Sequence, residues 1–379
     1  MKPGLAKRLE WAGENKYNSF NSYKGLAYIN EYRAIGRWVK GEGKLLSPIE
    51  CSLDPVHLCD FLCGHCNAQR YLARDKSQSS IKNRLMAKRH MFNLIDFLSD
   101  WGVKGICVGG GGEPLMNPAV WGLPARIAKK GMESSFATNG CLIDKKMARE
   151  MMLCRWVGVS VDAGDRKTFR LVHGVDRFEK VIDNLRLLVK RKKESGSGVD
   201  IAYKVLVRPD NIDSILPACR LAKEIGVRDF HVRPVDLERK DFKAAIKLNY
   251  NIAKILDIFQ SCHRLEDEDF RVFTVVHKYG NNFKVRHNFK KCLASPLMIQ
   301  CCADGNVYVC ADHRIEKRFV LGAHYPKPLA ILKFWGSAMH RRLIESIRPD
   351  KECGRCTYGE YSRQIEEAVI KDVMCLNFP

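Results

Sequence analysis

The chain has 379 residues, enough to bury a large core, and its 46% hydrophobic and 28% charged residues are ordinary for a soluble globular protein. No stretch approaches the roughly 18 to 20 apolar residues that cross a bilayer, and residues 1–20 lack the apolar segment of a signal peptide. We therefore expect a cytoplasmic protein with no membrane partner. The 64 Lys and Arg against 43 Asp and Glu give a net charge of +21. This excess favours an anionic substrate or partner, a nucleic acid among them. The alternative is that the basic residues only keep the protein soluble.

Residues 1–48 show no clear period and are predicted to form a helical or irregular extension. From residue 49 to 263, short apolar runs alternate with amphipathic segments. The predicted strands are Ile49–Leu53, Gly105–Gly109, Ser134–Ala137, Val157–Val161, Ile201–Val207 and Phe230–Pro234. The predicted helices are 81–99, 118–130, 143–153, 177–194, 211–225 and 240–260. Six strand–helix repeats predict an α/β fold, a partial (βα)6 TIM-like barrel, because a full barrel would need two more units.

The pattern changes after this barrel. Residues 264–291 are charged and are predicted to be a linker. The runs Leu297–Cys302 and Val307–Cys310 flank a turn-rich tetrad, which predicts a β-hairpin. Helices are expected at 336–347 and 360–373. Residues 292–379 are thus predicted to be a smaller C-terminal α+β domain.

Sixteen cysteines are unusual for a reducing compartment, where structural disulfides are rare. Four lie between residues 51 and 66 and seven between 292 and 375, and such clustering indicates metal or iron–sulfur ligation. The five others are scattered through apolar or helical segments and are expected to be ordinary core residues. These are Cys107, Cys141, Cys154, Cys219 and Cys262.

The first predicted strand leads into the sequence CDFLCGHC, which has the spacing Cys59-x3-Cys63-x2-Cys66. Three thiolates bind three irons of a four-iron cube and leave the fourth iron open. A cluster used only for electron transfer normally has four protein thiolates. Cys51 lies eight residues upstream on the strand and is interpreted as structural. The loop therefore predicts a catalytic cluster.

This loop resembles the signature of the radical S-adenosylmethionine (SAM) superfamily, and the resemblance extends over about residues 49–235. The second strand ends in GGGGEPLMNP, which is similar to the Gly-Gly-Glu-Pro element of that family. The resemblance implies that Gly111, Gly112 and Glu113 bind the methionyl ammonium of SAM. Close backbone approach requires glycine, and a carboxylate is a natural partner for an ammonium.

Further strand ends fit the same family pattern. His65 takes the place of the family's aromatic residue beside the adenine. Thr138 and Asn139 resemble the family's Thr-Asn-Gly element, and Ser160 and Asp162 resemble its Ser-x-Asp element near the ribose hydroxyls. Two arginines end the next strands, Arg208 and Arg233. Each of them either contacts the SAM carboxylate or an anionic substrate, or lies on the surface. Ligands bind at the strand ends of barrels, so we expect the polar side chains at these strand ends to converge.

The resemblance also implies a reaction and its cofactors. In this family a reduced [4Fe-4S] cluster cleaves SAM to methionine and a 5′-deoxyadenosyl radical, which abstracts hydrogen from a substrate C–H bond. The protein positions the reactants and excludes competing reactions. An electron donor such as flavodoxin or ferredoxin is the expected protein partner.

The C-terminal cysteines suggest a second cluster. Cys292, Gly305 and Cys310 are spaced as at the start of the auxiliary-cluster domains called SPASM and twitch, and Cys353-x2-Cys356 follows. The two further cysteines of a full SPASM pattern are missing, which favours a twitch-type site with one auxiliary [4Fe-4S] cluster on these four thiolates. A zinc site is the alternative. Of the spare thiols Cys301, Cys302 and Cys375, the last is an alternative ligand.

Several functions stay open at this stage. The charge favours an anionic substrate, such as a nucleotide, a nucleic-acid base or a phosphorylated small molecule. The auxiliary-cluster resemblance equally allows an enzyme that modifies a peptide or protein, and the twitch spacing allows a sugar or aminoglycoside dehydrogenase. A non-catalytic iron–sulfur or zinc protein that binds nucleic acid would explain the cysteines and the charge, but not Glu113 and the polar strand ends. The sequence therefore predicts a radical SAM enzyme without defining its substrate.

Overall fold

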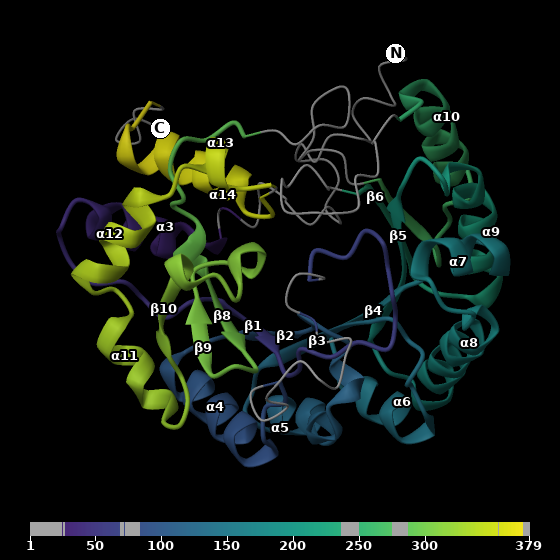
Figure 1. Ribbon diagram of the computed structural model, residues 1–379, viewed down its shortest axis with the longest axis horizontal. Helices are drawn as coiled ribbons and strands as arrows, with labels where there is room; N and C mark the ends of the chain where they lie inside the picture. Colours follow the sequence, from purple (N-terminus) through teal and green to yellow (C-terminus); the bar gives the residue numbers. More distant parts are fainter. Residues whose placement is uncertain are drawn as a thin grey trace.

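The computed structural model describes residues 25, 27–68, 72, 84–235, 250–274, 287–354 and 356–373. Its strands form one ten-stranded sheet in the order β10-β9-β8-β1-β2-β3-β4-β5-β6-β7. Figure 1 shows this sheet as an open arc with helices along its outer side. Among the described residues, no helix is long and apolar enough to cross a membrane. The partial-barrel prediction is confirmed.

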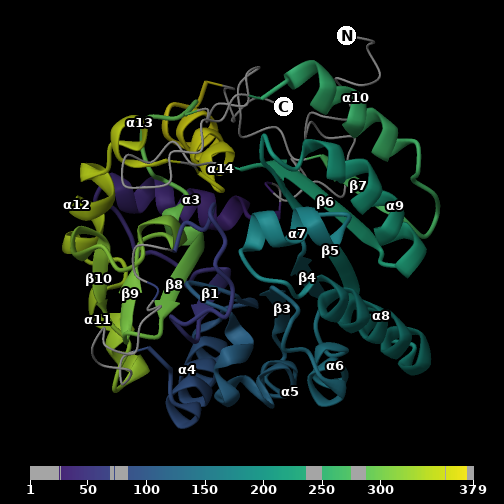
Figure 2. The ribbon, with the colours of Figure 1, turned by 45° about the vertical axis from the view of Figure 1, so that its right-hand side comes forward.

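Seven parallel strands form the larger part of the arc, which Figure 2 shows from a second direction. They are β1 (Glu50–Asp54), β2 (Gly105–Val108), β3 (Glu133–Thr138), β4 (Trp156–Ser160), β5 (Asp200–Val207), β6 (Asp229–Pro234) and β7 (Arg271–Thr274). The first six strands confirm the predicted strands, and each end lies within one residue of its predicted position. The seventh strand lies inside residues 264–291, which were predicted to be a linker, and this strand was not predicted. Four residues on an edge strand carry too little alternation for the sequence to reveal.

Helices follow most of these strands along the outer side. They are α4 (Lys88–Trp101), α5 (Leu123–Lys129), α6 (Lys145–Met151), α7 (Arg166–His173), α8 (Phe178–Ser195), α9 (Ile215–Ile225) and α10 (Ile252–His263). Only α7 has no counterpart in the sequence prediction. The predicted starts of the helices at 81–99 and 240–260 fall on residues 81–83 and 240–249, outside the described residues.

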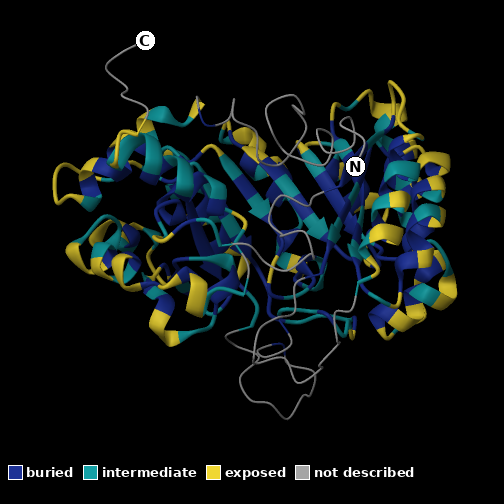
Figure 3. Cartoon of the chain, turned by 90° about the horizontal axis from the view of Figure 1, so that it is seen from above, coloured by how far each residue is buried: buried dark blue, intermediate teal, exposed yellow. Residues whose placement is uncertain are grey.

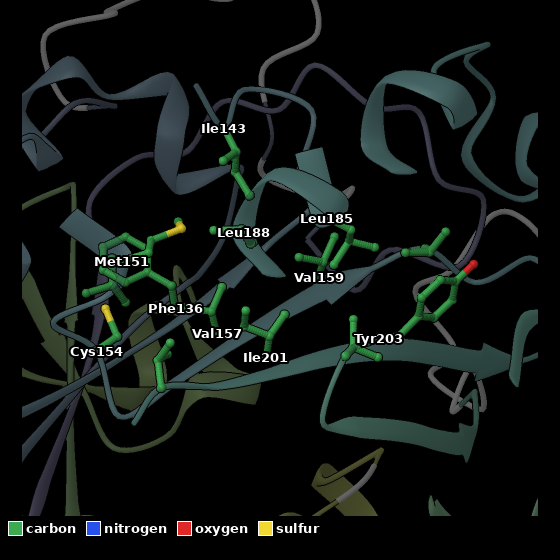
Figure 4. Close-up of a cluster of buried hydrophobic side chains, with 14 of the residues drawn as sticks. Phe136, Ile143, Met151, Cys154, Val157, Val159, Leu185, Leu188, Ile201 and Tyr203 are labelled. Atoms are coloured by element: carbon green, nitrogen blue, oxygen red, sulfur yellow. The ribbon is translucent and has the colours of Figure 1, made fainter. Parts of the chain in front are cut away.

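The core lies between the sheet and these outer helices. Figure 4 shows Phe136 and Val157 on neighbouring strands pointing toward Leu185 and Leu188 of α8, and all four side chains are fully buried. Each such side chain contributes roughly 1.5–3 kcal/mol by its removal from water. Figure 3 shows the matching surface pattern, with exposed positions along the outer helices and buried or intermediate ones along the strands. The face of the sheet toward the outer helices is thus fully buried, and the inner face is partly exposed.

The C-terminal segment extends the same sheet. Strand β8 (Met298–Cys302) pairs in parallel with β1 and antiparallel with β9 (Asn306–Tyr308), and β10 (Val320–Ala323) pairs with β9. The predicted hairpin is thus confirmed, and its pairing with β1 brings the C-terminal cysteines beside the barrel. The assignment of residues 292–379 to a separate domain stays a prediction.

Short helices complete this end of the arc. They are α11 (Ile331–Phe334), α12 (Ala338–Ser346), α13 (Pro349–Glu352) and α14 (Gly359–Gln364), which continues as a π-helical turn at Ile365–Ile370. Helix α3 (Ile29–Val39), from the predicted N-terminal extension, packs against that turn, and Tyr32 donates a hydrogen bond to Gln364. The two ends of the described chain therefore stabilise each other.

Candidate functional site

A cavity of about 330 Å³ lies at the carboxyl ends of the parallel strands. Its wall includes nearly all of the residues that were predicted to hold the first cluster and SAM. They are Cys59, Cys63, His65, Cys66, Gly112, Glu113, Thr138, Asn139, Ser160, Asp162 and Arg233. Gly111 is not part of the wall, and its backbone N–H donates to Asp54 at 3.0 Å. Residues that are far apart in the chain therefore converge because parallel strands end at one edge of a sheet.

The cysteine loop is fastened to the end of helix α7. The N–H of Leu62 donates to the carbonyl of His173 at 2.9 Å, and the sulfur of Cys63 lies 3.0 Å from His173 Nδ1. The other ring nitrogen of His173 donates to the carbonyl of Val161 at 2.8 Å. Sequence reasoning missed His173, because no motif marks it and α7 itself was not predicted.

The donor set of this loop fits an iron–sulfur cluster. Among the described residues of the cavity wall, the cysteines are Cys59, Cys63 and Cys66, so a four-iron cube would keep one iron without a thiolate. Burial raises the pKa of Cys59 to about 12 and that of Cys63 well above its usual value. A bound cation reverses that shift because thiolates are the ligand form.

The glycine-rich turn after β2 lies directly against the cysteine loop. A Cβ on Gly112 would lie 2.1 Å from the carbonyl oxygen of Leu58, so that position admits only glycine. The N–H of Glu113 donates to the same carbonyl at 2.8 Å. This close backbone approach fixes where the Glu113 side chain enters the cavity.

The Glu113 carboxylate is almost fully buried and accepts three hydrogen bonds. Its donors are the Thr138 hydroxyl at 2.6 Å, the Asn139 N–H at 2.7 Å and the Leu115 N–H at 3.2 Å. Burial raises the pKa of Glu113 from 4.5 to about 7, although these hydrogen bonds oppose the shift. A buried carboxylate, whose negative charge is poorly solvated, is a suitable partner for an ammonium group.

This pKa shift predicts a pH effect on stability. Between pH 4.5 and about 7 the folded protein holds the Glu113 proton more firmly than the unfolded chain. The stability that this proton gives is therefore present below pH 4.5 and is lost as the pH rises through 7. Glu113→Gln should remove this decline, on the order of 3 kcal/mol in the free energy of unfolding. Urea denaturation of the cluster-free proteins across this range measures it, and identical slopes for both proteins would contradict the expectation.

The end of β4 brings Ser160 and Asp162 into the cavity wall. Asp162 has a left-handed backbone with φ of 57°, and its Oδ1 accepts the N–H of Leu206 at 2.7 Å. Burial alone would raise the pKa of Asp162, but His65, with Nε2 at 3.3 Å from Oδ2, holds it below its usual value. The cysteine loop and β4 are thus joined through His65 and Asp162.

The arginines of this region differ in their surroundings. Arg208 is buried and paired with Asp210, whose oxygens lie 2.8 and 2.5 Å from its guanidinium nitrogens. Arg233 lines the cavity, and none of the described residues forms a hydrogen bond or an ion pair with its side chain. Arg314 also lines the cavity and was missed, since it lies in the C-terminal segment and belongs to no recognised motif. Its only sequence signal is its place four residues after Cys310.

The four C-terminal cysteines lie near one another. Cys292 precedes β8, Cys310 follows β9, Cys353 ends α13 and Cys356 precedes α14. Burial is the main cause that raises the pKa of Cys356, and repulsion from the thiolate forms of the other three cysteines raises it further. This repulsion shows that the three cysteines lie near Cys356. His313 Nε2 lies 3.5 Å from the Cys353 sulfur. Cys301 and Cys302 are buried in β8, and Cys375 lies outside the described residues.

Comparisons with known proteins agree with this geometry. Residues 54–202 match the family model described as the Radical SAM superfamily. A probable GTP 3′,8-cyclase of Sulfurisphaera tokodaii is 25% identical over 267 residues, covering 67% of this chain and 78% of the relative. One from Saccharolobus islandicus is 24% identical over 53% of this chain. This chain spans 62% of that relative's length, which is less than two thirds.

Solved structures show the same fold. SuiB of Streptococcus suis, bound to the precursor peptide SuiA, superimposes with a TM-score of 0.63 at 16% identity, covering 94% of this chain and 81% of SuiB. The AdoMet-bound anSMEcpe superimposes with a TM-score of 0.54 at 16% identity, covering 88% of this chain and 100% of anSMEcpe. At these identities the likeness concerns the fold alone.

Proposed function

The chain is an enzyme of the radical SAM superfamily, and we propose that it abstracts a hydrogen atom from a C–H bond of an anionic substrate bound beside SAM. The single observation that supports this proposal best is the cavity in which three cysteines face Glu113, Ser160 and Asp162. A non-catalytic cluster protein has no use for a buried ammonium-binding carboxylate at that place. The enzyme interpretation therefore explains more of the wall than a binding module does.

We assign the residues of the wall as follows. Cys59, Cys63 and Cys66 would hold the [4Fe-4S] cluster. When bound and reduced, this cluster supplies the electron that splits SAM into methionine and the 5′-deoxyadenosyl radical. Glu113, oriented by Thr138 and Asn139, would accept the methionyl ammonium.

The end of β4 and the adjoining loop would hold the nucleoside part of SAM. Ser160 and Asp162 would bind the ribose hydroxyls and His65 would lie beside the adenine, and all three residues line the cavity. The contact between His65 and Asp162 supports this assignment, because it fixes both side chains in one orientation before a ligand binds.

An anionic substrate is supported by the charge and by one arginine. Arg233 brings a cation into the cavity wall without a described carboxylate to neutralise it. A half-buried guanidinium binds a phosphate or carboxylate strongly because it is poorly solvated there. The curated relatives named GTP 3′,8-cyclase point to a nucleotide as one such substrate. A peptide substrate and a sugar substrate are the alternative outcomes of the experiment below.

The experiment uses the anaerobically reconstituted protein with SAM and dithionite. Release of 5′-deoxyadenosine is expected without any substrate, and nucleotides should raise it more than peptides or aminoglycosides do. Stimulation by peptides alone would favour the peptide-modifying function. Complete lack of 5′-deoxyadenosine in a protein that holds its iron would reject the proposed reaction.

We further propose one auxiliary [4Fe-4S] cluster on Cys292, Cys310, Cys353 and Cys356. The four thiols lie close enough together for the other three to raise the pKa of Cys356. Their spacing along the sequence, which is similar to that of auxiliary-cluster domains, supports the cluster. An auxiliary cluster would bind the substrate or accept an electron from the substrate radical.

Iron analysis tests this second cluster. The reconstituted protein should hold about eight irons and eight sulfides per chain, and the double variant Cys353→Ala/Cys356→Ala should hold about half of that. A zinc site would instead give about four irons and one zinc ion in the unaltered protein. In that case the double variant would lose zinc and keep its iron.

A further inference from the structure

Arg314 connects the C-terminal segment to the cavity. It follows β9 by six residues, is 7% exposed, and forms part of the same wall as Cys59 and Glu113. Its Nε donates to the carbonyl of Ala311 at 2.5 Å, which fixes the plane of the guanidinium. A planar guanidinium held in this way is suited to binding an oxyanion through two parallel hydrogen bonds.

Arg314 forms an ion pair with Asp54, the last residue of β1. Asp54 is fully buried, and its Oδ2 lies 3.2 Å from Arg314 Nη1. The same oxygen accepts the N–H of Gly111 at 3.0 Å. One carboxylate therefore holds both Arg314 and the glycine-rich turn that we assign to SAM.

The charge around Asp54 favours an arginine over a metal ion at this place. Ligand atoms of Asp54, His57 and Cys302 lie within 4.8 Å of one another and are all buried. Burial and the charge of Asp54 raise the pKa of the Cys302 thiol well above its usual value, so that this thiol is neutral. Arg314 already supplies the cation that the buried carboxylate needs.

We propose that Arg314 binds an oxyanion group of the substrate, a phosphate or a carboxylate. Asp54 would be a positioning residue that holds the Arg314 guanidinium at a fixed place relative to the SAM-binding turn. This inference rests on the proposed function and names the groups that would bind its anionic substrate. Arg233 enters the same cavity from β6, on the opposite part of the sheet. The substrate would therefore lie between the barrel and the C-terminal segment, where a cluster on Cys310 could also reach it.

The acidic residues of the wall do not oppose an anion here. Glu113 and Asp162 are 2% and 1% exposed. Glu113 is assigned to the SAM ammonium, and Asp162 is paired with His65 at 3.3 Å. Arg233 and Arg314 are the arginines among the described residues of the wall, and Arg314 is held there by Asp54.

Isothermal titration calorimetry of the anaerobically reconstituted holoenzyme with SAM tests this proposal. The probes are inorganic pyrophosphate and, separately, succinate, which distinguish a phosphate site from a carboxylate site. Arg314→Gln should weaken binding of the preferred probe at least tenfold, and Arg314→Lys should weaken it less, because lysine keeps the charge but not the planar fork. Arg318→Gln is the matched control, since Arg318 is exposed and pairs with Glu352 at 2.8 Å outside the cavity.

A second variant separates binding from folding. Arg314→Gln leaves Asp54 charged and buried without its cation, which can weaken binding by distorting the turn. The double variant Asp54→Asn/Arg314→Gln removes both charges and should bind the probe as weakly as Arg314→Gln. Recovery of the original affinity in the double variant would overturn the proposal, and so would unchanged affinity in Arg314→Gln or no binding of either probe to the unaltered enzyme. Since calorimetry needs no SAM cleavage, failure of the proposed reaction would show separately, as missing 5′-deoxyadenosine.

Discussion

Cys63→Ala is expected to lower 5′-deoxyadenosine formation more than a thousandfold and to remove about four irons per chain. The reason is that we assign Cys63 as the middle ligand of a set of three, and two thiolates would not hold a four-iron cube in place. Cys63 also contacts His173 and thereby connects the cluster loop to α7. The measurement is product release under dithionite, together with iron and sulfide analysis.

The control for this variant is Cys219→Ala. Cys219 is buried in α9 and is not part of the cavity wall, and its replacement should cost some stability but neither iron nor product. Thermal unfolding shows whether both variants fold. A Cys63→Ala protein that keeps all of its iron and its activity would remove the basis for the assigned cluster.

Glu113→Gln is expected to weaken SAM binding about 10- to 100-fold. A hydrogen bond to a charged group contributes roughly 1.5–3 kcal/mol, and every 1.4 kcal/mol is a factor of ten in affinity. The glutamine would also place an NH2 group near the N–H of Asn139 or the hydroxyl of Thr138, which now donate to the carboxylate. Equilibrium binding of SAM to the reconstituted protein measures the loss.

The matched control is Glu133→Gln. Glu133 lies at the exposed start of β3, at the end of the strand opposite to Thr138. This control removes the same charge from β3, the strand beside β2, and should leave the SAM affinity within twofold. An equal loss of affinity in both variants would show that the effect is the general charge of the protein, and not the buried carboxylate.

The local parts of the fold were predictable from the sequence because they depend on short-range patterns. Apolar runs separated by helical periodicity predicted β1 to β6 almost to the residue. The turn between Cys302 and Val307 predicted the hairpin of β8 and β9. The predicted residues of the cavity wall were recognised from their resemblance to the motifs of the radical SAM superfamily.

The sequence by itself determined the three-cysteine loop, the glycine-rich turn with Glu113 and the parallel strands that carry them, since each depends on residues that are neighbours in the chain. Only the tertiary structure decided that β8 pairs with β1, that β7 continues the sheet, and that His173 and Arg314 reach the cavity. The physical reason is that these contacts join segments more than a hundred residues apart, or depend on a short edge strand. Their free energy comes from burial and pairing in the folded chain, and no local pattern records it.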